Sequence, residues 1–106
     1  MTNEAAIALS GDLAGPPRPE DEELALLAKA LGHPVRILIL RSLLRLGTCH
    51  FGPLADLLPV AASTASQHLT ILKEAGLVKG EIDGARPCYC VDTEKLQRLR
   101  HLLGDL

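Results

Sequence analysis

Leucine residues at helical spacing, in segments that proline and glycine separate, constrain the fold of this chain most strongly. The first segment, 20–31, opens with acids, which suit the positive end of a helix dipole, and stops at Gly32. In the second, 34–46, Pro34 takes the first helical position, where its missing N–H costs nothing, and Gly47 ends the helix. This helix is apolar on nearly every face, which predicts that it lies at the centre of the core. Its apolar residues are Val35, Ile37, Leu38, Ile39, Leu40, Leu43, Leu44 and Leu46.

The middle of the chain predicts a short extended segment and two more helices. Residues 48–51 tolerate β structure and precede a Gly-Pro pair. A short third helix is expected over 54–58, closed by Pro59. A fourth helix runs from about Ser63 to Ala75 and stops at Gly76. Its inner face is formed by Ala65, Leu69 and Leu72.

A hairpin and a last helix complete the predicted order. Residues 77–82 and 88–91 indicate two strands joined by a turn at Asp83-Gly84. Thr93 can cap the last helix, whose apolar residues are Leu96, Leu99, Leu102 and Leu103. The fold class is therefore α+β and mainly helical: four helices, a β-hairpin and a C-terminal helix.

The length of 106 residues is that of one compact domain. Residues 1–19, rich in glycine and proline, indicate a flexible tail, and 20–106 the folded domain. Apolar residues make up 47% of the chain but aromatics only 2%. Most of the apolar residues are leucine and alanine, which are strong helix formers, so this composition favours helices. No apolar run approaches the roughly 20 residues that span a bilayer, and a signal peptide is not recognisable. We therefore expect a cytoplasmic protein without a membrane partner.

Charge divides unevenly along the chain. Residues 1–23 hold six acids and one base, a net charge of −5, so the remaining residues carry +3 of the total −2. A mild positive field is compatible with nucleic-acid binding, but ordinary solvated charge gives the same count. The sequence lacks a Gly-rich phosphate loop, a Cys-x-x-Cys pair and a convincing set of nucleophile and base. We therefore do not expect an enzyme.

Three stretches together resemble the ArsR/SmtB family of metal- and thiol-responsive repressors. They are 30–36 (ALGHPVR, followed by apolar residues to 43), 63–69 (STASQHL) and 73–78 (KEAGLV). The resemblance covers about residues 24–103 and implies a winged helix-turn-helix. It further implies a homodimer built from the first and last helices, with the fourth helix in the major groove of an inverted-repeat operator and the hairpin along the backbone. Leucines on both terminal helices suit a dimer, although packing within one chain explains them equally well.

The start of the fourth helix carries the candidate base-reading side chains, because the second helix of a helix-turn-helix reaches base edges there. These residues are Ser63, Thr64, Ser66, Gln67 and His68. Gln67 is favoured because its amide can pair bidentately with adenine. Lys73 and Arg86 are phosphate candidates. The alternative is that Ser63 or Thr64 only caps the helix and that Gln67 is plain surface, and Ala61 stands where the family commonly has a serine cap.

The chain has three cysteines, and this odd number argues against a framework of structural disulfides. Cys88 and Cys90 share one face of a strand, while Tyr89 and Val91 face the core. In a winged helix the segment after the second helix pairs with the outer hairpin strand, which brings Cys49 beside them. Some family members carry a Cys-x-Cys pair there together with Cys-Tyr-Cys in the wing, but here Phe51 replaces one cysteine.

Three thiolates suit trivalent arsenic or antimony, which needs only three ligands, so we expect such an ion as the inducer bound by Cys49, Cys88 and Cys90. Zinc, a less favoured ligand, usually takes a fourth, for which His50 is adjacent. The rival is redox or persulfide sensing, in which Cys49 forms a disulfide with a wing cysteine. Two further alternatives remain open. The cysteines could be inert, or the chain could be a dimeric interaction or soft-metal buffering protein that does not bind DNA. His101 lacks the companions of the family's zinc site and is expected to be surface.

Overall fold

The computed structural model describes residues 15–47, 49–52, 56, 58–81 and 88–106. Helix α4 (Pro34–Leu46) begins and ends as the sequence predicts. Helix α3 (Pro19–Leu31) ends as predicted but begins one residue earlier, at Pro19, which the prediction assigned to the tail and which suits the first helical turn. Gly47 adopts the left-handed conformation, with a φ of 69°, and its N–H closes α4 on the Leu44 carbonyl. The N-cap of α4 is His33, whose Nδ1 accepts a hydrogen bond from the Val35 N–H.

Strand β1 (His50–Phe51) confirms the predicted extended segment, and helix α5 (Ala62–Glu74) the predicted fourth helix. The hairpin strands are β2 (Val78–Glu81) and β3 (Cys88–Val91), and helix α6 (Thr93–Gly104) follows. Several predicted features lie outside the described residues. They are the first 14 residues of the predicted 1–19 tail, most of the predicted 54–58 helix, the hairpin turn and Arg86.

The cap of α6 corrects one prediction. The N-cap is Asp92, whose carboxylate accepts from the Lys95 N–H at 3.0 Å, and Thr93 is the first helical residue. Both residue types cap helices well, and the sequence alone does not separate neighbours of this kind. The predicted helix is otherwise confirmed.

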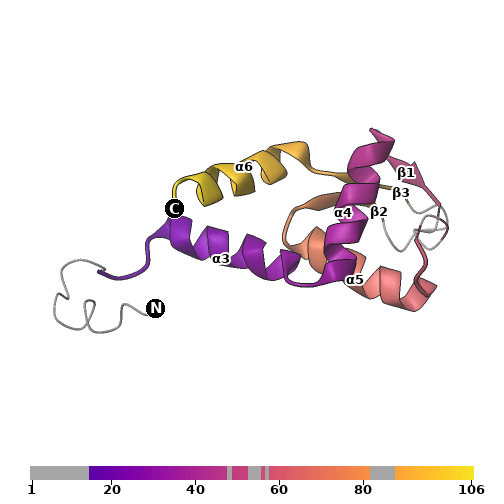
Figure 1. Ribbon diagram of the computed structural model, residues 1–106, viewed down its shortest axis with the longest axis horizontal. Helices are drawn as coiled ribbons and strands as arrows, with labels where there is room; N and C mark the ends of the chain where they lie inside the picture. The colour runs from indigo at the N-terminus through magenta and orange to yellow at the C-terminus, as the bar shows by residue number, and fades with distance from the viewer. Residues whose placement is uncertain (1–14, 48, 53–55, 57, 82–87) are drawn as a thin grey trace.

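In space, α3 and α6 lie side by side at one end of the molecule, while α4, α5 and the small sheet form the other (Figure 1). The sheet has the order β1-β3-β2, with both pairs antiparallel. Strand β3 is therefore central and connects the hairpin to the segment that follows α4. No helix in the described part of the chain has the length and apolar character to cross a membrane.

One core lies between the helices and the sheet. It includes the predicted inner face of α5, the leucines of α6 at 96, 99 and 102, and Tyr89, which is 1% exposed. Helix α4 departs from the prediction of burial on every side, because Ile37, Leu44 and Leu46 are 40 to 43% exposed. Its Ile39, Leu40 and Leu43 are buried, so α4 presents one face to the core and another to the surface.

Candidate nucleic-acid interface and cysteine pair

Helix α5 presents one polar, exposed face. Ser63, Ser66, Gln67 and Lys73 are exposed, and their spacing of three and four residues aligns them along the helix. The N-cap is Ala61, without a side-chain cap, so neither Ser63 nor Thr64 occupies the capping position. The capping alternative for these two residues is therefore wrong. Thr64 is half-buried at the edge of the face.

Thr70 belongs to the same exposed face and was missed by the sequence reasoning. Its Oγ1 donates to the Ser66 carbonyl at 3.0 Å, and the residue is exposed. Its spacing of three residues from Gln67 and four from Ser66 is the signal that could have revealed it. This hydrogen bond fixes the hydroxyl beside the middle of the face.

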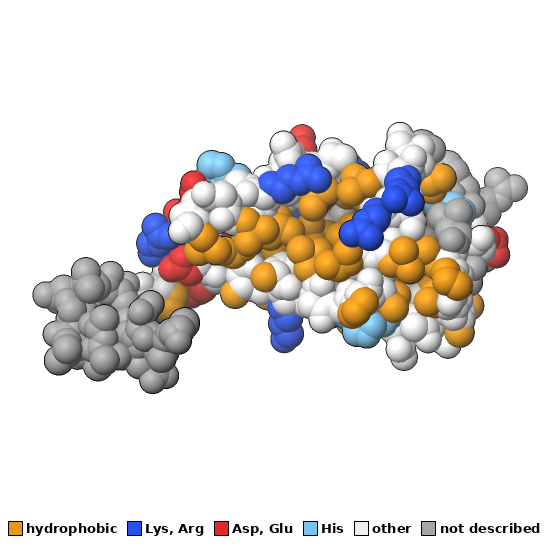
Figure 2. Space-filling model, in the orientation of Figure 1, with side chains coloured by type: hydrophobic (Ala, Val, Ile, Leu, Met, Phe, Trp, Pro, Cys, Tyr) orange, Lys and Arg blue, Asp and Glu red, His pale blue; other side chains and the backbone are white. Residues whose placement is uncertain are grey.

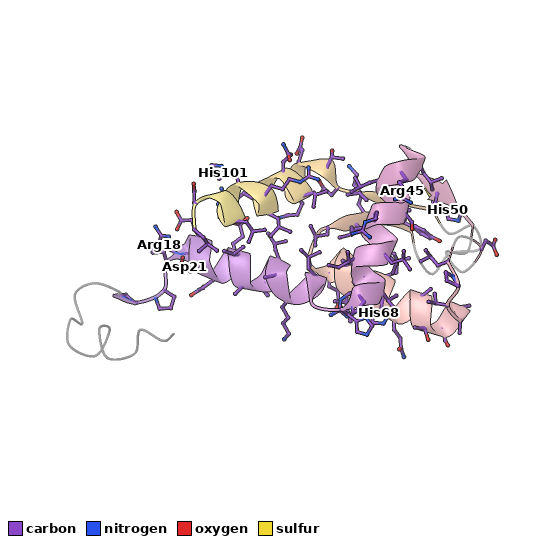
Figure 3. The ribbon with its side chains drawn as sticks, viewed as in Figure 1. Arg18, Asp21, Arg45, His50, His68 and His101 are labelled. Carbon is purple, nitrogen blue, oxygen red and sulfur yellow. A yellow bond between two sulfur atoms is a disulfide. The ribbon has the colours of Figure 1, made fainter. Side chains whose placement is uncertain are left out.

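The structure gives His68 a different environment from the other candidates. It is half-buried, and its ring centroid lies 4.3 Å from that of His33. An Nη1 of Arg36 lies 3.1 Å from its Nδ1. Figure 3 shows His68 against the first turn of α4. Burial of the ring, and then the nearby His33 and Arg36, hold the pKa of His68 below its usual value.

The sheet register brings Cys49 beside the wing strand. His50 pairs with Tyr89 and Phe51 with Cys88, so Cys49 comes opposite Cys90. Cys49 and Cys90 form a disulfide, with their Cα atoms 4.4 Å apart. Cys88 is the free thiol and is half-buried. The predicted neighbourhood of Cys49 is therefore confirmed, and a disulfide, which the cysteine count argued against, is present.

The described residues contain no cluster of three or more histidine, cysteine, aspartate or glutamate side chains poised to hold a metal. Cys88 and Cys90 share a strand face, but residues two apart on a strand are separated by about 6.6 Å. Thiolates around one ion lie closer together, since metal–sulfur bonds are about 2.3 Å long for zinc. The two bonded sulfurs and Cys88 therefore do not form a ligand triangle in this conformation.

A groove of about 430 Å³ opens beside the disulfide. Leu43, Leu44 and Val91 form its apolar part, and Lys79 of β2 lies at it with an exposed side chain. The pair Cys49–Cys90 also lines this groove, so it can be reached from solvent. A small reagent or ion therefore has a route to these sulfurs.

Tyr89 fixes the central strand next to the cysteines. Its hydroxyl donates to the Gly52 carbonyl at 2.8 Å, and its ring lies 5.4 Å from that of His50. Burial, with a smaller effect of Asp56, raises the pKa of Tyr89 to about 12. The phenol is thus a hydrogen-bond donor throughout the neutral range.

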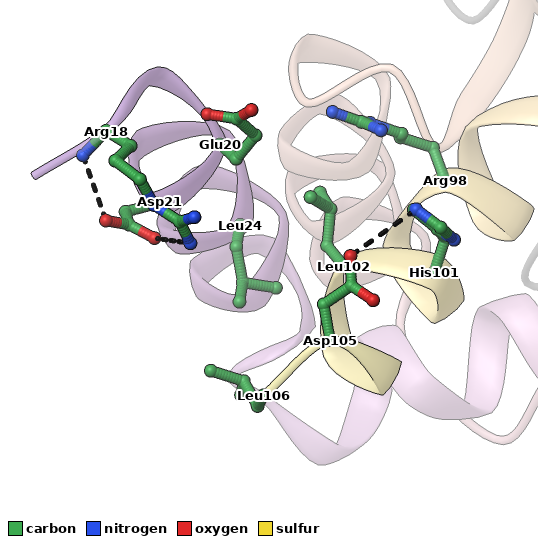
Figure 4. Close-up of a pocket in the computed structure, with 9 residues that line it drawn as sticks. All are labelled: Arg18, Glu20, Asp21, Leu24, Arg98, His101, Leu102, Asp105 and Leu106. Carbon is green, nitrogen blue, oxygen red and sulfur yellow. Dashed lines mark hydrogen bonds and ion pairs between the residues drawn. The ribbon is translucent and has the colours of Figure 1, made fainter.

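A second hollow lies where α3 begins and α6 ends (Figure 4). His101 there pairs with Asp105 at 3.4 Å, and both side chains are about two-thirds exposed. Arg18 and Asp21 pair across the first turn of α3. The surface location predicted for His101 is confirmed.

Comparison with known proteins gives a consistent result. A model of the bacterial regulatory protein arsR family matches residues 33–79. An HTH-type transcriptional regulator of Methanocaldococcus jannaschii is 33% identical over 85 residues, which cover 80% of this chain and 96% of that protein. The HTH-type transcriptional repressor SmtB of Mycobacterium tuberculosis is 42% identical over 72% of this chain and 56% of its own length.

A solved structure agrees with the sequence relatives. The crystal structure of a "possible transcriptional regulator for arsenical resistance" superposes with a TM-score of 0.57 at 30% identity, over 78% of this chain and 81% of the other. The order of helices and the antiparallel hairpin are those of a winged helix-turn-helix. This chain therefore belongs to the ArsR/SmtB family of winged-helix transcriptional repressors, which are DNA-binding regulators and not enzymes.

Proposed function

We propose that this repressor is released from its operator by chemistry at Cys49 and Cys90. The observation that supports the proposal is the bond between these two residues, which connects the residue directly before β1 to the central strand β3 of the hairpin. A change at the pair moves β3 relative to the segment after α4. Because α4 and β3 both pack against the rest of the winged helix, such a change can alter how α5 and the hairpin fit DNA.

The exposed face of α5 is the proposed base-reading surface. Gln67 would pair with a base edge in the major groove, with Ser63, Ser66 and Thr70 beside it and Thr64 at the edge. Lys73, on the same face, would contact phosphate, as would Arg86 in the wing. The exposure of the face and the absence of a capping role for its first residues support this assignment.

The proposed inducer is trivalent arsenic or antimony, bound by Cys49, Cys88 and Cys90 after the pair is reduced. Soft thiolates favour soft ions, and a three-coordinate ion needs no further ligand. Cys88 would have to approach the other two sulfurs, which would pull on the wing strand. The solved relative named for arsenical resistance supports this choice of ion.

A second candidate is redox sensing, which the disulfide itself favours. In this reaction two thiols lose two electrons and two protons to hydrogen peroxide, which becomes two molecules of water, while the sulfur–sulfur bond forms. Cys88 has no part in this reaction. It therefore separates the two candidates.

We also propose that the repressor acts as a homodimer. Most of the leucines in the terminal stripes are buried within one chain, but Leu26 is 68% exposed, Leu103 47% and Leu106 92%. Figure 2 shows hydrophobic side chains at the surface along α3 and α6. A second copy that covers these side chains would present two α5 helices to two half-sites.

The test uses reduced protein and a DNA duplex carrying the region upstream of its own gene. Arsenite should release wild-type protein and Glu22→Gln, an exposed control on α3 outside both the thiol site and the DNA-reading face, but not Cys88→Ser or Cys49→Ser. If peroxide releases wild-type protein and Cys88→Ser alike while arsenite releases neither, the redox candidate holds. Release by both reagents from Cys49→Ser and Cys90→Ser would reject the proposal. Arsenite binding without any DNA binding would favour a buffering protein.

A further inference from the structure

We infer that Arg36 is a positioning residue for the DNA-reading helix: it ties His68 of α5 to the corner between α3 and α4, and the tie holds only while His68 is neutral. The inference rests on the proposed role of α5 in reading DNA. It gives His68 a part in DNA binding that requires no contact with the DNA.

The guanidinium of Arg36 is bound on two sides. Its Nε donates to the Ala30 carbonyl at 2.6 Å, and an Nη2 reaches the Lys29 carbonyl at 3.5 Å. Both carbonyls belong to the last turn of α3, where the Lys29 carbonyl also accepts the Gly32 N–H that closes the helix. Its Nη1 lies 3.1 Å from Nδ1 of His68, 32 positions along the chain. One planar fork thus joins α3, α4 and α5.

His33 supports the same contact from the other side. Its Nδ1 accepts from the Val35 N–H at 3.1 Å, which fixes the ring as the cap of α4. The His68 ring packs at 4.3 Å from this fixed ring. Residue 68 of α5 is therefore fixed both by packing and by a directional hydrogen bond.

The chemistry of the bond fixes the proton on His68. Arginine can only donate, so Nδ1 must present a lone pair and the ring must be neutral with its proton on Nε2. A protonated ring would have a donor at Nδ1, facing another donor, beside a permanent positive charge. Of the described residues, only His33 and Arg36 act electrostatically on this ring, and both disfavour its charge. Burial acts in the same direction.

The consequence for DNA binding follows from the neighbour of His68 on α5. Gln67, the proposed base-reading residue, precedes it directly, so a turn of the helix that releases His68 also moves Gln67. Acidification should therefore weaken specific binding. A direct contact between His68 and phosphate predicts the opposite, because a protonated histidine would strengthen binding.

Because the pKa of His68 lies below the usual histidine value, operator affinity should be measured at constant salt from about pH 7.5 down to about pH 5. The duplex is selected from a random pool with wild-type protein. We expect the affinity of wild-type protein and His101→Gln to fall by up to about tenfold per pH unit across this titration. His68→Gln, whose amide oxygen still accepts from Arg36, should bind well at neutral pH and lose this part of the pH dependence.

Arg36→Lys should lower affinity by about tenfold because a single ammonium group cannot bridge the α3 carbonyls and His68. The salt dependence of binding should stay unchanged, since no phosphate contact is lost. NMR titration should give His68 a pKa below the usual histidine value, and Arg36→Lys should shift it.

Wild-type affinity in Arg36→Lys, or stronger binding at acid pH that His68→Gln removes, would overturn the inference. Failure of wild-type protein to select any duplex would reject the proposed function instead. In that case the NMR titration still decides whether the tie exists.

Discussion

Arg98 on α6 donates three hydrogen bonds to the carboxylate of Glu23 on α3, at 2.8, 3.0 and 3.1 Å. The two residues lie 75 positions apart, on the first and last helices of the described fold. The planar guanidinium meets both carboxylate oxygens, a geometry that fixes the relative position of the two helices. The side chains are 41% and 33% exposed, so solvent weakens the pair.

We expect Glu23→Gln to lower the thermal midpoint of unfolding at neutral pH by a small amount that disappears in acid. The hydrogen bonds from Arg98 lower the pKa of Glu23, so the stabilisation is complete above the usual carboxyl pKa of 4.5 and is lost as pH falls through the lowered value. Glu22→Gln, at the neighbouring exposed position, is the control. A difference between the two variants that persists below about pH 2 would contradict this assignment.

Tyr89→Phe should reduce the free energy of unfolding by about 1 to 2 kcal/mol, because the Gly52 carbonyl loses its donor. Urea denaturation measures the loss. The chain contains one tyrosine and no tryptophan, so an absorbance titration of tyrosinate follows Tyr89 alone. Ionisation should centre on about pH 12, and the tyrosine's contribution to stability should be complete below pH 10 and fall as pH rises through 12. Titration at the ordinary value in folded protein would contradict the burial of this hydroxyl.

Gly80→Ala should destabilise the wing by more than about 2 kcal/mol. Gly80 has a φ of 123°, and a Cβ there would meet the Cys88 carbonyl oxygen and come within 2.9 Å of the Tyr89 Cα. Both obstacles are backbone of the paired strand and cannot move aside cheaply. Hydrogen exchange of β2 and β3 amides should report the change. Gly104→Ala, where a Cβ meets nothing within 4 Å, should leave exchange in these strands unaltered.

Gln67→Ala and Lys73→Ala should affect DNA binding in different ways. Loss of the Gln67 amide should relax preference at one base pair by about 1 to 3 kcal/mol, since phosphate contacts remain. Loss of Lys73 should weaken binding to all sequences and reduce the salt slope by about 0.9. A panel of operator variants measured at several salt concentrations separates the two effects. Equal losses on every variant for Gln67→Ala would exclude base reading.

If a dimer buries Leu26 and Leu103, the double variant Leu26→Lys and Leu103→Lys should be monomeric. Sedimentation at micromolar concentration should give a dimer for wild-type protein and a monomer for the double variant, with helical content retained because neither side chain belongs to the core. Ile37→Lys, an exposed apolar position on α4, serves as control. A wild-type monomer would exclude the dimer.

Helix limits were predictable because they depend on local chemistry. Pro34 and Gly47 bound α4 through properties of one residue each, a fixed φ and access to the left-handed region. The inner face of α5 followed from its helical period, and Ala65, Leu69 and Leu72 are all buried. The strand pairing that brings Cys49 opposite Cys90 followed from the fold that the sequence motifs imply.

The environment of His68 could not be predicted in the same way. His68 lies on α5 between the polar and the apolar face, so periodicity does not determine whether its side chain points to the core or to solvent. Its partners, His33 and Arg36, lie more than 30 positions earlier, and only the packing of α4 against α5 brings them near. Burial of α4 on all sides was overpredicted for a related reason: apolar composition does not say how many neighbours a helix has in a small domain.

The disulfide also changes the connectivity of the DNA-reading region. Cys49 and Cys90 are 41 positions apart, and all of α5 and β2 lie between them, so oxidation turns this region into a covalent ring. The chain leaves this ring through α4 and α3 on one side and through α6 on the other. In the chain-entropy model, closing a ring of this size stabilises the folded protein against unfolding by about 4 kcal/mol. A single peptide cleavage within the ring leaves both fragments attached, and reduction is then required to separate them.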